Sequence, residues 1–236
     1  MFGISGRQVG KWLRRARRPA LLGTLRRTSP LSDVWGFDRG NAVDRFYIES
    51  FLTEHSQDIV GRTLEVESPC YTTLYGAGVT IRDVLDINSS NKNATLIADL
   101  SAADLLPSDA FDCFVLTQTL HYIYDTRAAI RHAYRILRPG GVLLVTVPSV
   151  SRIDPESKND YWRYTAASCS LLFEEAFGPE NTTVNSYGNV LSCIAFLTGM
   201  AAEELSWEEL RKNDEAFPLI IGVRAVKGTG KLGQRK

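Results

Sequence analysis

The chain has 236 residues, of which 44% are hydrophobic and 23% are charged, and its 27 basic side chains balance its 27 acidic ones. This composition is typical of a soluble globular protein with one main domain. It argues against a membrane-spanning protein, because no apolar run approaches the roughly 20 residues that a bilayer requires. The four scattered cysteines form no CxxC pair, so we expect reduced thiols, no metal site and a cytoplasmic location.

The basic residues are concentrated near the N-terminus. Eight of them and no acidic residue precede Asp33, so the rest of the chain is net acidic. Residues 1–34 are therefore predicted to form a basic arm, which either covers its own acidic domain or contacts nucleic acid, anionic lipid or an acidic partner. Arginines also interrupt this region, so we expect no secretory signal in it.

Residues 35–60 are expected to form a helical lid segment. The stretch 35–41 (WGFDRGN) has two glycines around an Asp-Arg pair and predicts an irregular loop. Phe46 and Phe51 belong to a set of apolar residues at helical spacing, which predicts an amphipathic helix over 44–54.

Seven short segments predict β-strands. Apolar runs among them are typical of strands buried in a parallel sheet, whereas residues 182–187 alternate like a strand. The seven segments lie at residues 62–67, 79–85, 95–98, 114–116, 142–147, 182–187 and 219–226. Between the first two, residues 68–77 predict an irregular crossover where a helix would be usual. The Gly- and Lys-rich tail at 227–236 is expected to be disordered.

The stretch Phe111–Pro148 is the clearest single unit, with two apolar runs on either side of a helical pattern. Asp125 can cap that helix, and Pro139-Gly140-Gly141 is predicted to end it. Two strands joined in this way must pair in parallel. Ligands bind beyond the carboxyl ends of such strands, so chemistry is expected at Thr117–His121 and Pro148–Arg152.

Further helices are predicted from the Thr165 cap to Phe177, over 190–205 and over 207–210. The order of elements favours a three-layer α/β/α sandwich with a seven-stranded, mostly parallel sheet, whose last strand is antiparallel. This domain is predicted to occupy residues 61–226.

Several of these segments carry a family resemblance. Residues 64–66 and 79–83 resemble first and second strands that end in acids, and 98–100 resembles an acid-containing turn. The run from Phe111-Asp112 to His121, followed by LRPGG at 137–141, resembles a fourth strand and the approach to a fifth. In these features the chain resembles class I S-adenosylmethionine-dependent methyltransferases of the type 11 kind. The resemblance implies a Rossmann-like fold and S-adenosylmethionine as cofactor.

The resemblance also implies roles for individual residues at the strand ends. Glu65 would contact the cofactor ammonium or orient the loop after it. Asp83, or alternatively Asp86, would accept hydrogen bonds from the ribose diol, although either carboxylate could instead cap a turn. Five further cofactor contacts are implied, two in the turn near adenine and three beside the sulfonium: Asp99, Leu100, Thr117, Gln118 and Thr119.

One departure from the family concerns its glycine-rich first loop. The three glycine positions hold Glu67, Pro69 and Tyr71 in this chain. Glycine serves there because the backbone approaches the cofactor closely and often at positive φ, and proline also removes a donor. We therefore expect residues 68–78 to take another path, or other contacts to hold the cofactor, or binding to be lost.

The acceptor side of the site is expected to include His121, the one histidine near the carboxyl end of a strand, as a candidate general base. Aromatic rings and arginines on two segments would bind the acceptor by stacking and anion contacts. These residues are Tyr161, Trp162, Arg163, Tyr164, Arg45 and Tyr47.

The motifs WGFDRG and DRFYIESFL resemble bacterial enzymes that methylate saccharides or secondary metabolites. We therefore expect a small-molecule acceptor, methylated on an oxygen of a sugar or secondary metabolite, with a homodimer as an open possibility. Two alternatives stand beside this one. A nucleic-acid methyltransferase would use the basic arm, and a non-catalytic scaffold would keep the fold without the glycine loop.

Overall fold

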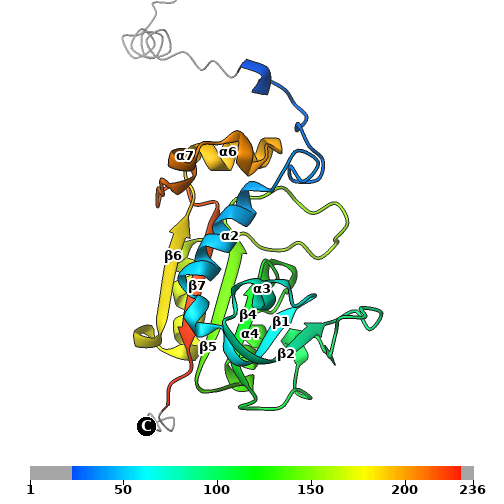
Figure 1. The fold of residues 1–236 in the computed structure, drawn as a ribbon, viewed down its shortest axis with the longest axis vertical. Helices are drawn as coiled ribbons and strands as arrows, with labels where there is room; N and C mark the ends of the chain where they lie inside the picture. Colours follow the sequence, from blue (N-terminus) through cyan, green and yellow to red (C-terminus); the bar gives the residue numbers. More distant parts are fainter. Residues whose placement is uncertain (1–22, 230–236) are drawn as a thin grey trace, which may run out of the picture.

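A seven-stranded sheet runs through the middle of the molecule, in the order β3-β2-β1-β4-β5-β7-β6 (Figure 1). The computed structural model describes residues 23–229. The strands are β1 (Val60–Val66), β2 (Gly78–Asp86), β3 (Leu96–Ile97), β4 (Phe111–Thr117), β5 (Leu137–Pro148), β6 (Thr182–Tyr187) and β7 (Ile220–Val226). Neighbouring strands pair in parallel, except that β7 is antiparallel to both β5 and β6. This confirms the predicted mostly parallel sheet with an antiparallel last strand.

Helices cover both faces of the sheet. They are α2 (Val43–Glu54), α3 (Cys70–Tyr75), α4 (Thr126–Ile136), α5 (Ala166–Phe177), α6 (Val190–Thr198) and α7 (Trp207–Arg211). Two of the predicted caps are present: Asp125 accepts the backbone N–H of Ala128 at 2.9 Å, and Thr165 accepts that of Ser168 at 3.2 Å. Each cap satisfies a donor that the first helical turn leaves free, which sets where α4 and α5 begin.

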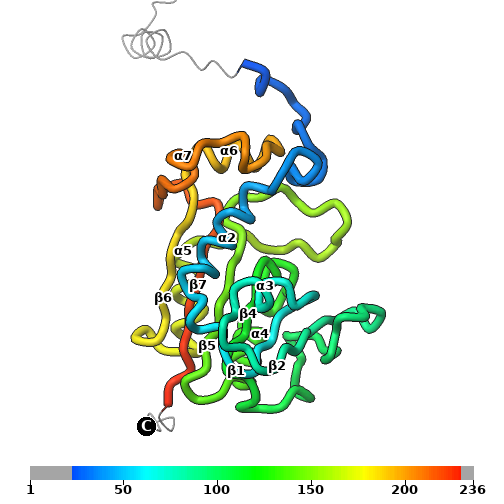
Figure 2. Tube along the Cα trace, viewed as in Figure 1, coloured from blue at the N-terminus to red at the C-terminus, as the bar shows by residue number. Residues whose placement is uncertain are grey.

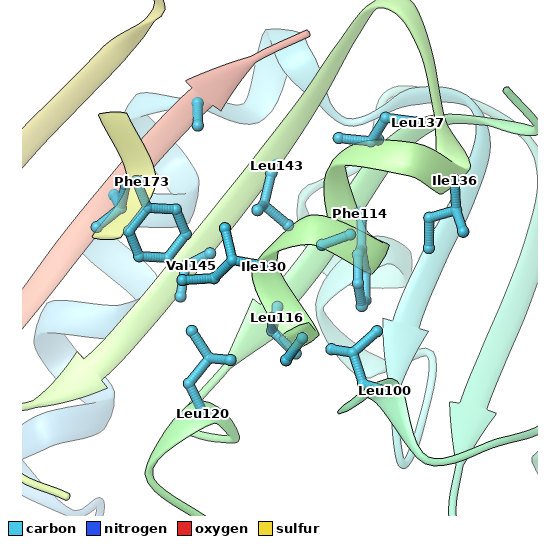
Figure 3. Close-up of a cluster of buried hydrophobic side chains, with 14 of the residues drawn as sticks. Leu100, Phe114, Leu116, Leu120, Ile130, Ile136, Leu137, Leu143, Val145 and Phe173 are labelled. Atoms are coloured by element: carbon cyan, nitrogen blue, oxygen red, sulfur yellow. The ribbon is translucent and has the colours of Figure 1, made fainter. Parts of the chain in front are cut away.

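The alternation of side chains along the central strands creates two cores. Phe114 and Leu116 of β4 face α4 and α5, together with Leu143 and Val145 of β5 (Figure 3). The intervening residues, such as Val115, face the opposite core with α2 and α6. Because successive residues of a strand point to opposite faces, continuous apolar runs produce the three-layer sandwich.

Three local predictions were wrong. Residues 68–77 contain the short helix α3 rather than an irregular crossover. The PGG motif at 139–141 lies inside β5, because α4 already ends at Ile136 and Gly140 takes φ = 82° within an irregular strand start. The predicted helix over 190–205 stops at Thr198, where Gly199 adopts a left-handed cap at φ = 75°.

The segment before β1 is part of the folded body. Helix α2, which we predicted to belong to a lid, buries apolar side chains such as Ile48 and Phe51 completely. Figure 2 shows the chain before α2 running beside α6 and next to the loop that follows β5, and Leu31 donates to the carbonyl of Thr198. Residues 1–22 of the predicted arm and 230–236 of the predicted tail lie outside the described residues. Within residues 23–229 no helix is long and apolar enough to cross a membrane.

Candidate active site

A cavity of about 720 Å³ opens at the carboxyl ends of β1, β2, β4 and β5. The strand order reverses beside β1 and β4, and open α/β sheets bind ligands at such a switch point. Both segments predicted to carry chemistry contribute to its wall, one from Thr117 to Tyr122 and the other from Pro148 to Arg152. The N-terminal segment and α2 form another part of the wall, with the residues Trp35, Phe37, Asp44 and Arg45.

Glu65 lies at the end of β1, borders this cavity and is only 2% exposed. Its carboxylate accepts the backbone N–H groups of Tyr71 at 2.9 Å and Thr72 at 2.8 Å, in the first turn of α3. Burial raises the pKa of Glu65 above its usual range, although these two hydrogen bonds oppose the rise. Of its two predicted roles, the structure therefore supports orientation of the loop after β1.

The two candidate ribose carboxylates have different environments. Asp83 sits inside β2, 9% exposed, where it pairs with Arg62 at 2.7 Å and accepts the hydroxyl of Thr95 at 3.0 Å. Asp86 lies at the last position of β2 and borders the cavity. Our first choice, Asp83, is thus placed away from the cavity, because β2 runs three residues further than that choice assumed. The alternative, Asp86, is at the expected place.

The predicted adenine contacts also lie away from the cavity lining. Asp99 caps a short 3-10 helix, accepting the N–H of Ser101 at 2.8 Å. Leu100 is 5% exposed and packs in the core between the sheet and α4. Asp99 therefore caps a helix and Leu100 packs in the core, and neither residue lines the cavity that Asp86 borders.

The loop after β1 contains a left-handed backbone conformation of the kind that glycine favours, although no glycine is present at that position. Glu67, at the first glycine position, adopts φ = 69°, a conformation that costs an L-residue about 1–2 kcal/mol. The N–H groups of Glu67 and Ser68 donate to the carbonyls of Leu85 and Val66. Since Tyr71 and Thr72 donate to Glu65 as well, most backbone donors of this loop already have partners.

Replacing Glu67 with glycine should therefore stabilise the protein. We expect Glu67→Gly to raise the free energy of unfolding by up to about 1 kcal/mol, because relief of the left-handed strain exceeds the extra chain entropy of glycine. Urea unfolding followed by circular dichroism measures this change. Glu67→Ala is the matched control, since alanine removes the charge but keeps the strain, and an equal gain in that variant would contradict the strain argument.

Thr117, the last residue of β4, and the two residues after it, Gln118 and Thr119, line the cavity. Gln118 adopts φ = 44°, and its N–H donates to the carbonyl of Thr146 at 2.8 Å. The hydroxyl of Thr119 donates to the carbonyl of Thr117 at 2.8 Å. These contacts hold a tight, left-handed turn against β5, which presents the segment to the cavity.

His121 borders the same cavity and is 6% exposed. Its Nδ1 is buried and has no hydrogen-bond partner among the described residues, and its ring lies 3.9 Å from that of Tyr122. Burial lowers the pKa of His121 from 6.5 to about 4, although nearby Asp160 and Asp154 oppose the shift. The imidazole is therefore neutral at physiological pH.

This shift predicts a loss of stability in acid. The folded-state pKa of His121 lies below its unfolded value, so its contribution to stability is full above about pH 6.5 and is lost as the pH falls through about 4. The loss amounts to about 3 kcal/mol in the free energy of unfolding. His121→Gln should remove this part of the pH dependence in urea titrations at several pH values. A variant as acid-sensitive as the parent over this range would show that His121 is not the group responsible.

The residues predicted to bind acceptor after β5 mostly hold the loop itself. Arg163 pairs with Asp160 and donates to the carbonyls of Ser151 at 3.4 Å and Arg152 at 2.6 Å. Tyr164 is buried and donates to the carbonyl of Leu120 at 3.1 Å. None of the four predicted residues Tyr161, Trp162, Arg163 and Tyr164 borders the cavity.

Tyr161 and Trp162 form an exposed aromatic group with Tyr124 outside the cavity. On the other wall, Tyr47 is 2% exposed and donates to the carbonyl of Leu210 at 2.9 Å, so it belongs to the core. Arg45 does line the cavity, and it donates to the hydroxyl of Tyr71.

The structure adds cavity residues to which sequence reasoning gave no role, chiefly Asp44, Trp35 and Phe37. Asp44 lies in the first turn of α2. Burial raises the pKa of this carboxyl from 3.8 to about 6, although the charge of Arg45 opposes the shift. The sequence signal for these residues is the motif WGFDRGN followed by Asp44, which lines the site where we predicted a lid segment.

Residues 79–145 match the family profile described as a methyltransferase domain. The chain is 37% identical over 77 residues to an uncharacterized methyltransferase of Mycobacterium tuberculosis, a match that covers 32% of this chain and 36% of that protein. It is 28% identical over 132 residues to the ubiquinone/menaquinone biosynthesis C-methyltransferase UbiE of Pectobacterium carotovorum, covering 49% of this chain and 52% of the relative. The chain thus spans about a third to a half of the length of these relatives.

Solved structures extend the likeness over the whole fold. An S-adenosylmethionine-dependent methyltransferase from Mesorhizobium loti aligns with a TM-score of 0.52 at 16% identity, over 81% of this chain and all of that one. The [4+2]-cyclase SpnF aligns with a TM-score of 0.53 at 17% identity, over 98% of each chain. The chain therefore shares a Rossmann-like fold with these proteins. Since SpnF is named for a different reaction, function must be argued from the site.

Proposed function

We propose that this protein is an S-adenosylmethionine-dependent methyltransferase that acts on a small molecule. The observation that carries the proposal is the cavity at the switch point of the sheet, which brings Asp86 together with Thr117–Thr119. All four residues lie within the segment 79–145 that matches a methyltransferase domain. Bound S-adenosylmethionine would supply a methyl group on an already activated sulfonium. Asp86 would hold the ribose, because a carboxylate can accept hydrogen bonds from both hydroxyls of a diol.

The amino-acid end of the cofactor would be held differently from the usual glycine loop. Most backbone donors between Glu67 and Thr72 have partners within the protein. Side chains that border this part of the cavity, such as Ser68 and Tyr71, are the available contacts. This arrangement supports the second of the three expectations from the sequence, that contacts outside the glycine loop retain the cofactor.

We propose a hydroxyl oxygen of a sugar or secondary metabolite as the methyl acceptor. Transfer to a hydroxyl needs a base for its proton, and the best base has a pKa near the working pH. His121 and Asp44 both border the cavity. Asp44 suits the role better, because the pKa of its carboxyl is raised to about 6 whereas that of His121 falls to about 4. The relatives named C-methyltransferase make carbon the competing acceptor atom.

The lining of the cavity argues for a small acceptor rather than a nucleic acid. Its acidic members are Asp44, Glu65, Glu67, Asp86, Asp154 and Asp160, against the arginines Arg45 and Arg152. A polyanion would meet net repulsion there, and phosphate contacts dominate nucleic-acid affinity. A local anionic group placed against the arginines would not meet this repulsion.

Calorimetry with S-adenosylmethionine and S-adenosylhomocysteine tests the proposal first. Binding in the micromolar range is expected, and no heat at millimolar cofactor would favour the non-catalytic scaffold. Incubation with cofactor carrying a labelled methyl group and a panel of hydroxylated metabolites then tests transfer. The position of label in the product decides between oxygen and carbon, and transfer to RNA or DNA alone would overturn the small-molecule proposal.

A further inference from the structure

Arg152 has an unusual environment for a charged side chain. It borders the cavity and stacks on Trp35, with its guanidinium carbon 4.0 Å from the ring centroid. Its Nε is buried and has no hydrogen-bond partner among residues 23–229. The terminal nitrogens of this half-buried guanidinium also have no partner within the described residues. A partly buried cation is costly to leave without an acceptor, so the arrangement suggests that a ligand supplies one.

The other half-buried arginines of the described chain all have polar partners. Arg45 donates to a tyrosine hydroxyl and Arg135 to backbone carbonyls, while the remaining three pair with carboxylates: Arg62, Arg163 and Arg224. Arg152 is the exception within residues 23–229, and it is also the one whose guanidinium stacks on a cavity-lining tryptophan. Arg135 also has a buried Nε without a partner, but its terminal nitrogens donate to Leu106, Ser108 and Ala103. The Arg152 guanidinium differs because none of its nitrogens has a partner within residues 23–229.

Both members of the stack are held in place from outside it. The carbonyls of Ser151 and Arg152 accept hydrogen bonds from Arg163, which Asp160 anchors. Trp35 adopts φ = 56°, a left-handed conformation that is strained for a bulky residue. The next N–H, that of Gly36, donates to the buried hydroxyl of Ser32 at 2.9 Å. These contacts hold the backbone of the two segments whose side chains form the stack.

We propose that Arg152, stacked on Trp35, binds an oxyanion of the methyl acceptor, a carboxylate or a phosphate. This inference rests on the proposed function, because it assigns the substrate class of the same cavity. The stack leaves one edge of the planar guanidinium for two parallel hydrogen bonds to an oxyanion. Phe37, Val150, Phe196 and Ile220 supply apolar surface on the same walls, which suits an acceptor whose body is apolar or flat.

Two acids of the lining in the loop that carries Arg152 have partners within the protein. Asp160 is neutralised by Arg163 at hydrogen-bond distance, and Asp154 accepts the hydroxyl of Tyr122 at 2.8 Å. Glu65 and Asp86 sit at the ends of β1 and β2, on the side assigned to the cofactor. Arg152 also borders a second cavity of about 650 Å³, and Arg27 is another cation in the lining of that cavity.

Nuclear magnetic resonance of arginine Nε–H groups in the full-length chain tests the proposal. The Arg152 resonance is assigned by its loss in Arg152→Lys, and the protein is titrated with sodium phosphate, sodium benzoate and the neutral analogue benzyl alcohol at constant ionic strength. We expect a saturable shift of this resonance with at least one anion, with a dissociation constant at or below roughly 10 mM. The anion that binds more tightly distinguishes a phosphorylated acceptor from a carboxylated one.

The variants separate a binding role from a packing role. Arg152→Gln should weaken anion binding at least about fivefold by calorimetry, whereas Arg152→Lys should retain part of it. Arg211→Gln is the matched control, because Arg211 stacks on Trp207 at 5.4 Å but does not border the cavity. The proposal is overturned if neither anion shifts the Arg152 resonance, if benzyl alcohol shifts it equally, or if Arg152→Gln binds anion as the parent does.

The titration runs both with and without saturating S-adenosylhomocysteine, so the two proposals fail separately. Absence of S-adenosylhomocysteine binding would count against the methyltransferase proposal and leave the anion result standing. Cofactor binding without any anion response would overturn the oxyanion site and leave the proposed function intact. If Arg152→Gln does not fold by circular dichroism, the parent titration and Arg152→Lys still decide the question.

Discussion

Replacing Asp44 with asparagine is expected to lower the rate of methyl transfer by about 10² to 10⁴-fold, the usual contribution of a positioned general base. The parent rate should rise with pH through about 6, because the carboxyl must lose its proton before it can accept one from the acceptor hydroxyl. Asp44→Asn should lose this rising limb. The measurement is the pH profile of kcat/KM with an acceptor found in the metabolite panel.

The same substitution should stabilise the fold. Burial raises the folded-state pKa of Asp44 above its unfolded value, so its contribution to stability is full below about pH 4 and is lost as the pH rises through about 6. Allowing for partial exposure, Asp44→Asn should raise the free energy of unfolding by about 1–2 kcal/mol near pH 8 and by almost nothing near pH 4. If Asp44→Asn is more stable but has unchanged turnover, Asp44 is not the general base, and His121 is the remaining candidate.

Asp86→Ala is expected to weaken S-adenosylhomocysteine binding by about 10 to 100-fold, which corresponds to the loss of charged hydrogen bonds worth about 1.5–3 kcal/mol. The carboxylate ends β2 and borders the cavity, and Asn88 and Asn91 orient it through hydrogen bonds of 2.8 and 2.6 Å. Isothermal titration calorimetry on the full-length chain measures the change.

Asp83→Ala is the matched control on the same strand. Asp83 pairs with Arg62 and accepts the hydroxyl of Thr95, away from the cavity. Its loss should leave cofactor affinity within about twofold and lower the free energy of unfolding by roughly 2 kcal/mol, because it leaves a half-buried guanidinium without its partner. If Asp83→Ala abolished binding while Asp86→Ala did not, the ribose assignment would revert to our first choice from the sequence.

Much of the fold could be predicted because its causes are local. Continuous apolar runs such as 142–147, with turns between them, indicate strands buried on both faces, and caps such as Asp125 and Thr165 indicate where helices begin. The order of these elements then implies the α/β sandwich and the edge of the sheet at which a ligand binds. The segments 117–121 and 148–152 were located in this way, and both border the cavity.

The choice between Asp83 and Asp86 depended on the structure, because the last residue of a strand is set by pairing with its neighbours. Pairing of Leu85 and Asp86 with Leu96 and Ile97 carries β2 to Asp86 and leaves Asp83 within the strand. The roles of the residues in the segment after β5 also depended on tertiary contacts. Its residue types suggested acceptor binding by Arg163, whereas tertiary contacts use Arg163 to hold the loop and present Arg152 instead.

By itself, the sequence of this protein determined the layers, the parallel sheet and the edge that carries the cavity, since periodicity and capping act over a few residues. Only the tertiary structure decided which side chains meet there. Trp35 and Arg152, and likewise Asp44 and His121, lie far apart in the chain and line one cavity because α2 and the loop after β5 pack over the same end of the sheet. Burial, and with it the raised pKa of Asp44 and the lowered pKa of His121, arises from that packing.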